Sequence, residues 1–363
     1  MKTWDLTLQS LCKTFEGHFK VGAILSHNDF DDAELIAMYK HHYNAVTAEN
    51  AMKPEYISKA PGVYYFDYAD MIVDFAEKND MMMVGHTLVW HAQSAKWLNR
   101  NEDDTVLTRA EAKTNLEAFI KEYAGRYSGR IHSWDVINEA FTDKNDEPYT
   151  GNWRDYLRRD TPNPKAVGHW YLAYENGADA SKGESGADYV FDAFYFARKY
   201  DPKAILYFNE YNEEFNHKCV AITDMVNDIN EQWRKHPEYD NRLLVEGIGM
   251  QSHHNHKDTK PEKIRAAFER FSKTGAVISI TEMDLTFGSA ENPAVPMSPE
   301  DAQTQKELYI ELFKIYIEYS KYIERITFWG LNDRDSWRAW GSPLFFDIED
   351  RAKDVFYEVI KLA

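Results

Sequence analysis

The chain has 363 residues, 44% of them hydrophobic and 15% aromatic, which is ample for a large hydrophobic core. Asp and Glu number 60 against 42 for Lys and Arg, so the formal net charge is −18 at pH 7. Because an acidic surface repels phosphate backbones and anionic lipids, we expect neither nucleic acid nor a membrane as a partner.

The cysteines and the first residues bear on the cellular compartment. Cys12 and Cys219 are the two cysteines, and they do not make a disulfide framework. The N-terminal sequence lacks the apolar core and the small-residue cleavage site of a signal peptide. No run approaches the roughly 18 apolar residues of a membrane span. We therefore expect a cytoplasmic protein, unless a leader has been removed; no oligomeric state follows from these observations.

Short apolar runs alternate with longer helical patterns along the whole chain. The apolar runs predict strands at residues 20–25, 44–50, 81–90, 131–139, 204–212, 244–253, 276–285 and 324–332. Apolar residues at three- and four-residue steps predict helices at 31–43, 68–80, 108–127, 186–200, 220–235, 261–273, 299–321 and 350–362.

Strands this apolar, each followed by a helix, are typical of a parallel sheet buried on both faces. Eight such units predict an α/β fold, a closed (β/α)8 TIM barrel, in a single domain spanning residues 1–363. An open, doubly wound sheet is the alternative, but no glycine-rich phosphate loop follows the first strand.

One long irregular stretch, residues 142–183, follows the fourth predicted strand. It is rich in Asp, Asn, Pro, Gly, Trp and Tyr. A loop of this length inside a compact domain is usually either functional or disordered. Its aromatic residues Trp153, Trp170, Tyr171 and Tyr174 favour an ordered lid or a wall of a cleft.

Polar and aromatic side chains collect where the predicted strands end. In a barrel these carboxyl ends form one face, and active sites lie there. In chain order the residues are Glu49, Asn50, Lys53, His86, Trp90, His91, Gln93, Asn138, Glu139, Asn209, Glu210, Asn212, Gln251, His253, His254, Glu282, Asp284, Trp329, Asn332, Asp333 and Trp337. We expect Glu139 and Glu282, from the fourth and seventh strands, to face each other across the barrel mouth.

Two carboxyl groups over a cleft lined with indoles and amides favour glycoside hydrolysis. One carboxyl group protonates the leaving oxygen while the other attacks the anomeric carbon. Amides can hydrogen-bond to sugar hydroxyls, and indoles can stack on sugar rings. A non-catalytic sugar-binding barrel is an alternative, but such a protein has usually lost one carboxylate.

A metal-dependent barrel hydrolase is a further alternative, because histidines are frequent metal ligands. His253 with His256, or His86 with His91, would supply the ligands. The five-residue step from His86 to His91 does not place both imidazoles on one strand face. We therefore expect no metal and no other cofactor.

Seven motifs occur in order along the chain: TAENAMK (47–53), GHTLVWH (85–91), WDVINEA (134–140), LYFNEYN (206–212), GIGMQSH (247–253), ITEMDL (280–285) and FWGLNDRDSW (328–337). With these motifs the chain resembles the glycoside hydrolase family 10 endo-β-1,4-xylanases, and the resemblance spans roughly residues 18–360. The resemblance implies a retaining endo-1,4-β-xylanase that acts by double displacement on xylan or xylo-oligosaccharides. A related retaining β-1,4-glycanase with cellulase or aryl-cellobiosidase side activity is the alternative.

The resemblance also implies roles for individual residues. Glu139 would be the acid/base, Glu282 the nucleophile, and His253 the residue that orients Glu282. The implied substrate-binding residues are Glu49, Asn50, Lys53, His86, Trp90, Gln93, Asn138, Tyr211, Gln251, Trp329 and Trp337, with Asn138 at the 2-hydroxyl of the sugar that is attacked.

The chain departs from the family pattern in two places near this site. Glu210 stands where members usually carry Asp, and the segment 142–183 is longer than in compact secreted members. This segment follows the predicted acid/base, so we expect it to shape the leaving-group side of the cleft. The lack of a signal peptide and the acidic surface resemble the intracellular branch of the family. This branch handles short xylo-oligosaccharides.

Overall fold

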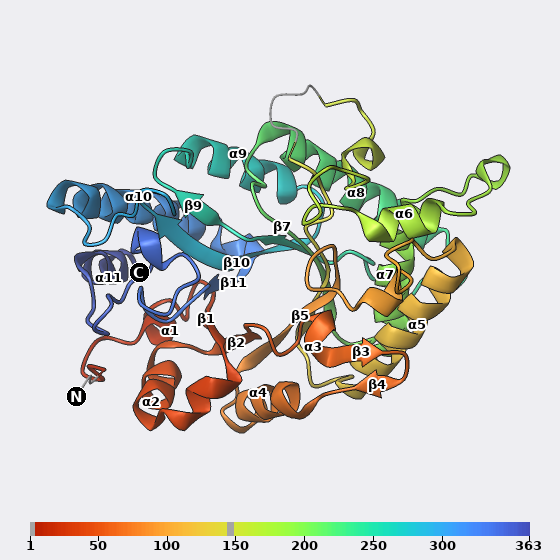
Figure 1. Cartoon of the computed structure of the whole chain (residues 1–363). Helices are drawn as coiled ribbons and strands as arrows, with labels where there is room; N and C mark the ends of the chain where they lie inside the picture. The colour runs from red at the N-terminus through yellow and green to blue at the C-terminus, as the bar shows by residue number, and fades with distance from the viewer. Residues whose placement is uncertain (1–3, 144–148) are drawn as a thin grey trace.

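The computed structural model describes residues 4–143 and 149–363. Residues 144–148 of the predicted long loop lie outside the described residues. Within the described ranges, eight parallel strands close into a barrel (Figure 1). They are β1 (Lys20–Leu25), β2 (Ala45–Ala48), β5 (Met82–Trp90), β6 (Ser133–Asn138), β7 (Ile205–Glu210), β8 (Gly247–Met250), β10 (Val277–Thr286) and β11 (Ile323–Phe328). Because β11 pairs with both β10 and β1, the sheet has no open edge there.

Helices follow the strands and lie around the outside of the barrel (Figure 1). They are α2 (Ala33–His42), α4 (Asp67–Lys78), α5 (Arg109–Arg126), α7 (Asp188–Tyr200), α8 (Asn216–Arg234), α9 (Pro261–Phe271), α10 (Pro299–Glu318) and α11 (Asp354–Val359). The local sequence explains where they begin. Thr108 and Glu111 form a reciprocal capping box at the start of α5, and Ser298 caps α10 before Pro299. The predicted (β/α)8 barrel is confirmed.

The barrel strands are buried on both faces, as their apolar sequences predict. Every residue of β2 and β6 is buried. Trp134 of β6 packs directly against Gly85 of β5, where a Cβ atom would lie 2.1 Å from the indole ring. These neighbouring strands therefore require glycine at position 85. Buried hydrophobic residues from Leu11 to Ile360 form one cluster.

Several short elements lie outside the predicted pattern. They are α1 (Leu11–Thr14), α3 (Pro54–Ile57), the antiparallel strands β3 (Ser58–Ala60) and β4 (Val63–Tyr64), β9 (His253–Asn255), and the 3-10 helices η1 (His27–Asp31), η2 (Lys96–Leu98), η5 (Ser320–Tyr322), η6 (Ala339–Gly341) and η7 (Ile360–Leu362). The predicted strand 244–253 is divided into β8 and β9, because Ser252 adopts a left-handed φ of 58° that interrupts it. β9 then pairs with the end of β10, which aligns His253 with Asp284.

The segment after β6 is more regular than the sequence suggests. Its described part contains η3 (Trp153–Tyr156), α6 (His169–Glu175) and η4 (Ala180–Lys182). Trp153 is 3% exposed, and its Nε1 donates to Asp228 of α8 at 2.8 Å. Trp170 and Tyr174 are also buried. The sequence predicted an ordered lid or cleft wall, and in the structure these aromatic side chains pack inward and hold the segment in place.

None of the helices among the described residues has the length and apolar character that a membrane-spanning helix needs.

Candidate active site

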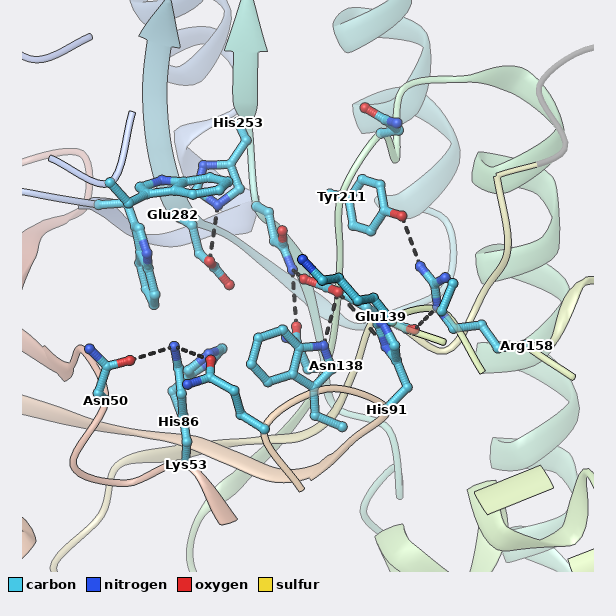
Figure 2. A pocket seen from close by; sticks show the side chains of 18 of the residues that line it. Asn50, Lys53, His86, His91, Asn138, Glu139, Arg158, Tyr211, His253 and Glu282 are labelled. Atoms are coloured by element: carbon cyan, nitrogen blue, oxygen red, sulfur yellow. Dashed lines mark hydrogen bonds and ion pairs between the residues drawn. The ribbon is translucent and has the colours of Figure 1, made fainter. Parts of the chain in front are cut away.

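A cleft of about 790 Å³ opens at the carboxyl ends of the barrel strands (Figure 2). Every predicted catalytic and substrate-binding residue lines it: Glu49, Asn50, Lys53, His86, Trp90, Gln93, Asn138, Glu139, Tyr211, Gln251, His253, Glu282, Trp329 and Trp337. These residues come from the ends of β2, β5, β6, β7, β8, β10 and β11 and from the loops that follow. The structure thus brings together side chains that lie as much as 288 positions apart in the sequence (337 − 49).

A chain of side-chain amides connects the two carboxyl groups of the cleft. Gln251 Nε2 donates to Glu139 Oε1 and to Asn138 Oδ1, both at 3.0 Å. Asn209 Nδ2 donates to the same Asn138 Oδ1 at 3.0 Å and to Glu282 Oε1 at 2.7 Å. Both bonds to Asn138 use its carbonyl oxygen, so its amide nitrogen is available to a ligand. The amides therefore fix Glu139 and Glu282 relative to each other.

Glu139 lies one residue beyond the end of β6, in an unusual main-chain conformation. Its φ is 54°, in the left-handed region that residues other than glycine adopt rarely. Trp90 Nε1 donates to its Oε2 at 2.9 Å, and His91 Nδ1 lies 3.9 Å from the same oxygen. The carboxyl group is thereby directed into the cleft, as Figure 2 shows.

Glu282 contacts a histidine that carries a positive charge. His253 Nε2 lies 3.1 Å from Glu282 Oε2, and its Nδ1 lies 3.0 Å from Asp284 Oδ2 (Figure 2). Burial opposes the imidazolium, but the two carboxylates outweigh burial and raise the pKa of His253 to about 10. Asp284 also accepts from Trp337 Nε1 at 3.0 Å and from Arg338. Asp284 is therefore a support for His253 and does not line the cleft.

One wall of the cleft is polar and partly charged. Lys53 Nζ donates to Asn50 Oδ1 at 2.8 Å and to Gln93 Oε1 at 2.9 Å. Burial lowers the pKa of Lys53, although the nearby carboxylates oppose this. His86 Nδ1 lies 2.8 Å from Asp135 Oδ2, which fixes the ring and leaves Nε2 for a ligand. This wall presents hydrogen-bonding groups that suit sugar hydroxyls.

Next to this polar wall the cleft is aromatic. Trp329 is buried and lies edge-on to His86, with ring centroids 5.3 Å apart. Trp337 is 62% exposed, and its ring lies 5.0 Å from that of His253. An exposed indole fixed by its Nε1 bond is a suitable surface for stacking on the apolar face of a sugar ring.

Further residues line the cleft that the sequence does not single out: Asp143, Arg158, Asn163, Lys165, Ala166 and Arg338. All except Arg338 belong to the segment after β6, whose length already indicated a functional loop. The segment thus forms part of the cleft wall, as expected. Apart from Ala166, the residues that it contributes are polar or charged rather than aromatic. None of the four aromatic residues expected to form a wall, Trp153, Trp170, Tyr171 and Tyr174, lines this cleft, so their interpretation as cleft wall is wrong.

Several strand-end residues lie behind the cleft. Asn209 is buried and accepts from Thr281 Oγ1 at 2.6 Å, so it supports the amide chain. Glu210 is buried and lies 3.2 Å from Lys218 Nζ. Burial raises the pKa of Glu210, while Lys218 and Arg158 oppose the shift. Asn332 and Asp333 are also buried away from the cleft.

Among the residues that the structure describes, the histidines do not assemble a metal site. His256 stacks on Phe287 with ring centroids 3.9 Å apart, whereas both ring nitrogens of His253 contact carboxylates. Across residues 4–143 and 149–363, no three His, Cys, Asp or Glu side chains are grouped so that they could hold a metal ion.

The chain is similar to known xylanases over nearly its whole length. A Dictyoglomus thermophilum beta-1,4-xylanase is 32% identical over 366 residues, which cover 98% of this chain and 92% of that protein. The endo-1,4-beta-xylanase A of Thermotoga maritima is 33% identical over 97% of this chain, but the match covers 31% of that longer protein. The solved structure of a Paenibacillus barcinonensis xylanase, complexed with a conduramine derivative, has a TM-score of 0.82 at 31% identity and covers 97% of this chain and 98% of that chain.

The family model described as glycosyl hydrolase family 10 matches residues 10–362. This match includes both barrel carboxyl groups, the amide chain between them and the segment that follows β6. The family, the barrel and the full-length relatives agree with the resemblance that the seven motifs indicated. The chain belongs to glycosyl hydrolase family 10.

Proposed function

We propose that this protein is a retaining endo-1,4-β-xylanase that hydrolyses xylan and xylo-oligosaccharides by double displacement. The observation that carries the proposal is the pair Glu139 and Glu282, held across one cleft by Gln251, Asn138 and Asn209. The names of the full-length relatives support xylan as the substrate class.

In the first step, Glu282 attacks the anomeric carbon and Glu139 gives its proton to the leaving oxygen. The bond between the anomeric carbon and the leaving oxygen breaks, and a covalent ester to Glu282 forms. Two donors hold Glu282 in place for this attack, the amide of Asn209 and the charged ring of His253. The part of the sugar chain that carries the protonated leaving oxygen then departs on the Glu139 side of the cleft.

In the second step, water enters where the leaving group was. Glu139, now ionised, takes a proton from the water, and the water oxygen attacks the anomeric carbon. The ester bond breaks and the Glu282 carboxylate is restored. Two inversions give net retention, and the two carboxyl groups supply all the acid, base and nucleophile that the reaction needs without a cofactor.

The remaining cleft residues bind sugar hydroxyls and rings in this proposal. The free amide nitrogen of Asn138 donates to the 2-hydroxyl of the sugar that is attacked. The polar wall with Asn50, Lys53 and His86 holds the sugars on the non-reducing side. Trp337 stacks on a ring face.

A product profile on xylan, defined xylo-oligosaccharides and cello-oligosaccharides tests the proposed substrate. We expect internal cleavage of xylan and of xylo-oligosaccharides, with much slower cleavage of the cello-oligosaccharides. Faster cleavage of cello-oligosaccharides than of xylo-oligosaccharides of equal length would instead assign a β-1,4-glucanase. Release of single xylose units alone would contradict the endo-acting mode.

We also propose that the enzyme works in the cytoplasm. Cys12 and Cys219 are free and buried, which suits a reducing compartment. Fractionation of the producing cells tests the location, and recovery of the activity from the culture medium would contradict it.

A further inference from the structure

We propose that Arg158 is a positioning residue for the acid/base carboxyl group of Glu139, a role that rests on the proposed function. Glu139 is not glycine, yet it has a φ of 54° immediately after β6. Such a conformation is energetically unfavourable and persists only where the surroundings impose it. The contacts around the main chain of Glu139 should therefore include the group that holds it.

Arg158 supplies that contact. Its Nε donates to the carbonyl oxygen of Glu139 at 2.8 Å, and its own backbone N–H donates to the carbonyl of Ala140 at 2.8 Å. Phe141 and Leu157 form an antiparallel bridge next to it. Residues 140–142 and 156–158 thus pair as a short ladder directly behind the acid/base. The long segment after β6 returns to the site where the strained residue needs support.

The other end of the guanidinium is fixed as well. Arg158 Nη2 donates to the Tyr211 hydroxyl at 2.8 Å (Figure 2). That hydroxyl donates to Asp143 at 2.5 Å. Lys218 Nζ reaches Asp143 at 3.1 Å and the carbonyl of Tyr211 at 2.9 Å. Arg158 is buried, which shields its own hydrogen bonds from water, whereas Asp143 at the far end of this chain of bonds is exposed. A planar guanidinium held at two ends positions its acceptor more strictly than a lysine can.

The packing around Arg158 leaves it little freedom to move. A Cβ atom on Gly168 would lie 1.9 Å from the carbonyl oxygen of Arg158, so the chain passes in direct contact there. Gly168 N–H also donates to the carbonyl of Arg159 at 3.0 Å. The main chain at position 158 is therefore fixed from both sides.

The charges that face Arg158 are consistent with a positioning role. The charge of Arg158 interacts with Glu210, Glu139, Asp143 and His91. Lys218 in turn pairs with Asp143 and Glu210. Burial, with the positive charge of Arg158, lowers the pKa of His91 to about 3. His91 is therefore neutral at ordinary pH, and it does not compete with Glu139 as a proton donor.

The test compares two substrates that differ in their need for a proton. Xylotetraose requires protonation of its leaving oxygen, whereas 2,4-dinitrophenyl β-xylobioside requires little. We would measure kcat/KM, which reports the steps up to the glycosyl-enzyme, for Arg158→Met and Arg158→Lys. The matched control is Arg159→Met, because Arg159 is the next residue, is exposed and does not line the cleft.

We expect Arg158→Met to lower kcat/KM for xylotetraose on the order of 10²-fold, as small misplacements of catalytic groups do. The dinitrophenyl substrate should lose less than about threefold, since it needs little general acid. Arg158→Lys should recover part of the loss, and Arg159→Met should leave both values unchanged. Equal losses on both substrates, or no loss on either, would overturn the proposal.

If Arg158→Met does not fold, Tyr211→Phe provides a second variant. It removes the hydroxyl that fixes Arg158 Nη2, so the same substrate difference should appear in weaker form. Its absence in a folded Tyr211→Phe enzyme would also overturn the proposal. A wild-type enzyme that prefers another β-1,4-glycan would refute the proposed substrate alone, because the comparison can be repeated with that glycan and its dinitrophenyl glycoside.

Discussion

The carboxyl groups of Glu139 and Glu282 have different neighbours, and this difference supports the roles proposed for them. Glu139 accepts from neutral donors, Trp90 and Gln251. Glu282 accepts from Asn209 and from the charged ring of His253. A positive charge in contact with Glu282 suits a carboxylate that acts as an anion, whereas neutral donors suit a group that must gain and lose a proton.

The first prediction separates these two roles. Glu139→Ala should lower cleavage of xylo-oligosaccharides by about 10²–10⁴-fold, the usual contribution of a general acid. Glycosylation with dinitrophenyl β-xylobioside should suffer far less. Glu282→Ala should abolish cleavage of both substrates, because no nucleophile remains. Steady-state kinetics and burst measurements check this, and equal sensitivity of the two variants to leaving-group acidity would contradict the assignment.

The second prediction concerns His253, whose pKa is raised to about 10 by Asp284 and Glu282 against the effect of burial. Its contribution to stability should be fully present below the ordinary histidine pKa of about 6.5 and should be lost as pH rises through about 10. The difference in unfolding free energy between wild type and His253→Gln should therefore shrink steadily from pH 6 to pH 10. Denaturation by urea at several pH values measures it. A difference that grows with pH would show that His253 is neutral in the folded protein.

At the scale of elements, the segment after β6 divides its residues between two tasks. Asn163, Lys165 and Ala166 line the cleft, whereas Trp153 is buried against α8 through its bond to Asp228. Arg158 lies between Trp153 and Asn163 in the sequence, and its Nε donates to the carbonyl oxygen of Glu139. The segment therefore holds itself to the barrel with its aromatic residues and presents polar residues to the cleft.

The third prediction tests this division. Trp153→Ala removes a buried indole and a hydrogen bond, so the free energy of unfolding should fall by about 3–5 kcal/mol. The pattern of products from xylohexaose should stay the same, because Trp153 does not line the cleft. Tyr357→Ala, an exposed aromatic on α11, is the control and should change stability by less than about 0.5 kcal/mol. A changed product pattern in Trp153→Ala with normal stability would restore the interpretation of Trp153 as part of the cleft wall.

For the whole molecule, the sequence predicts the barrel well because its signals are local and repeated. β1 matches its prediction at both ends, since KVGAIL is a short apolar run before a helical pattern. The paired carboxyl groups followed from the rule that barrel strands end on one face. The aromatic residues of 142–183 were misplaced because their burial depends on partners distant in sequence, such as Asp228 of α8 for Trp153 and Tyr189 of α7 for Tyr174. Arg158 was missed for the same reason, since its role depends on the pairing of 140–142 with 156–158.

The fourth prediction concerns domain organisation. We propose that residues 1–363 form a single domain, because buried hydrophobic residues from Leu11 to Ile360 belong to one cluster. Thermal unfolding should then be one cooperative transition, with a calorimetric enthalpy equal to the van't Hoff enthalpy. Scanning calorimetry at several scan rates checks this. Two separable transitions would show that parts of the chain unfold independently.

The central claim is that Glu282 is a nucleophile that forms a covalent glycosyl-enzyme. A retaining pair of carboxyl groups lies roughly 5–5.5 Å apart, which leaves no room for water between Glu282 and the sugar. Proton NMR during the first minutes of xylo-oligosaccharide hydrolysis tests the claim directly, before the product equilibrates. The account predicts that the β-anomer forms first. Initial formation of the α-anomer would contradict it, because a single displacement by water would then be the mechanism.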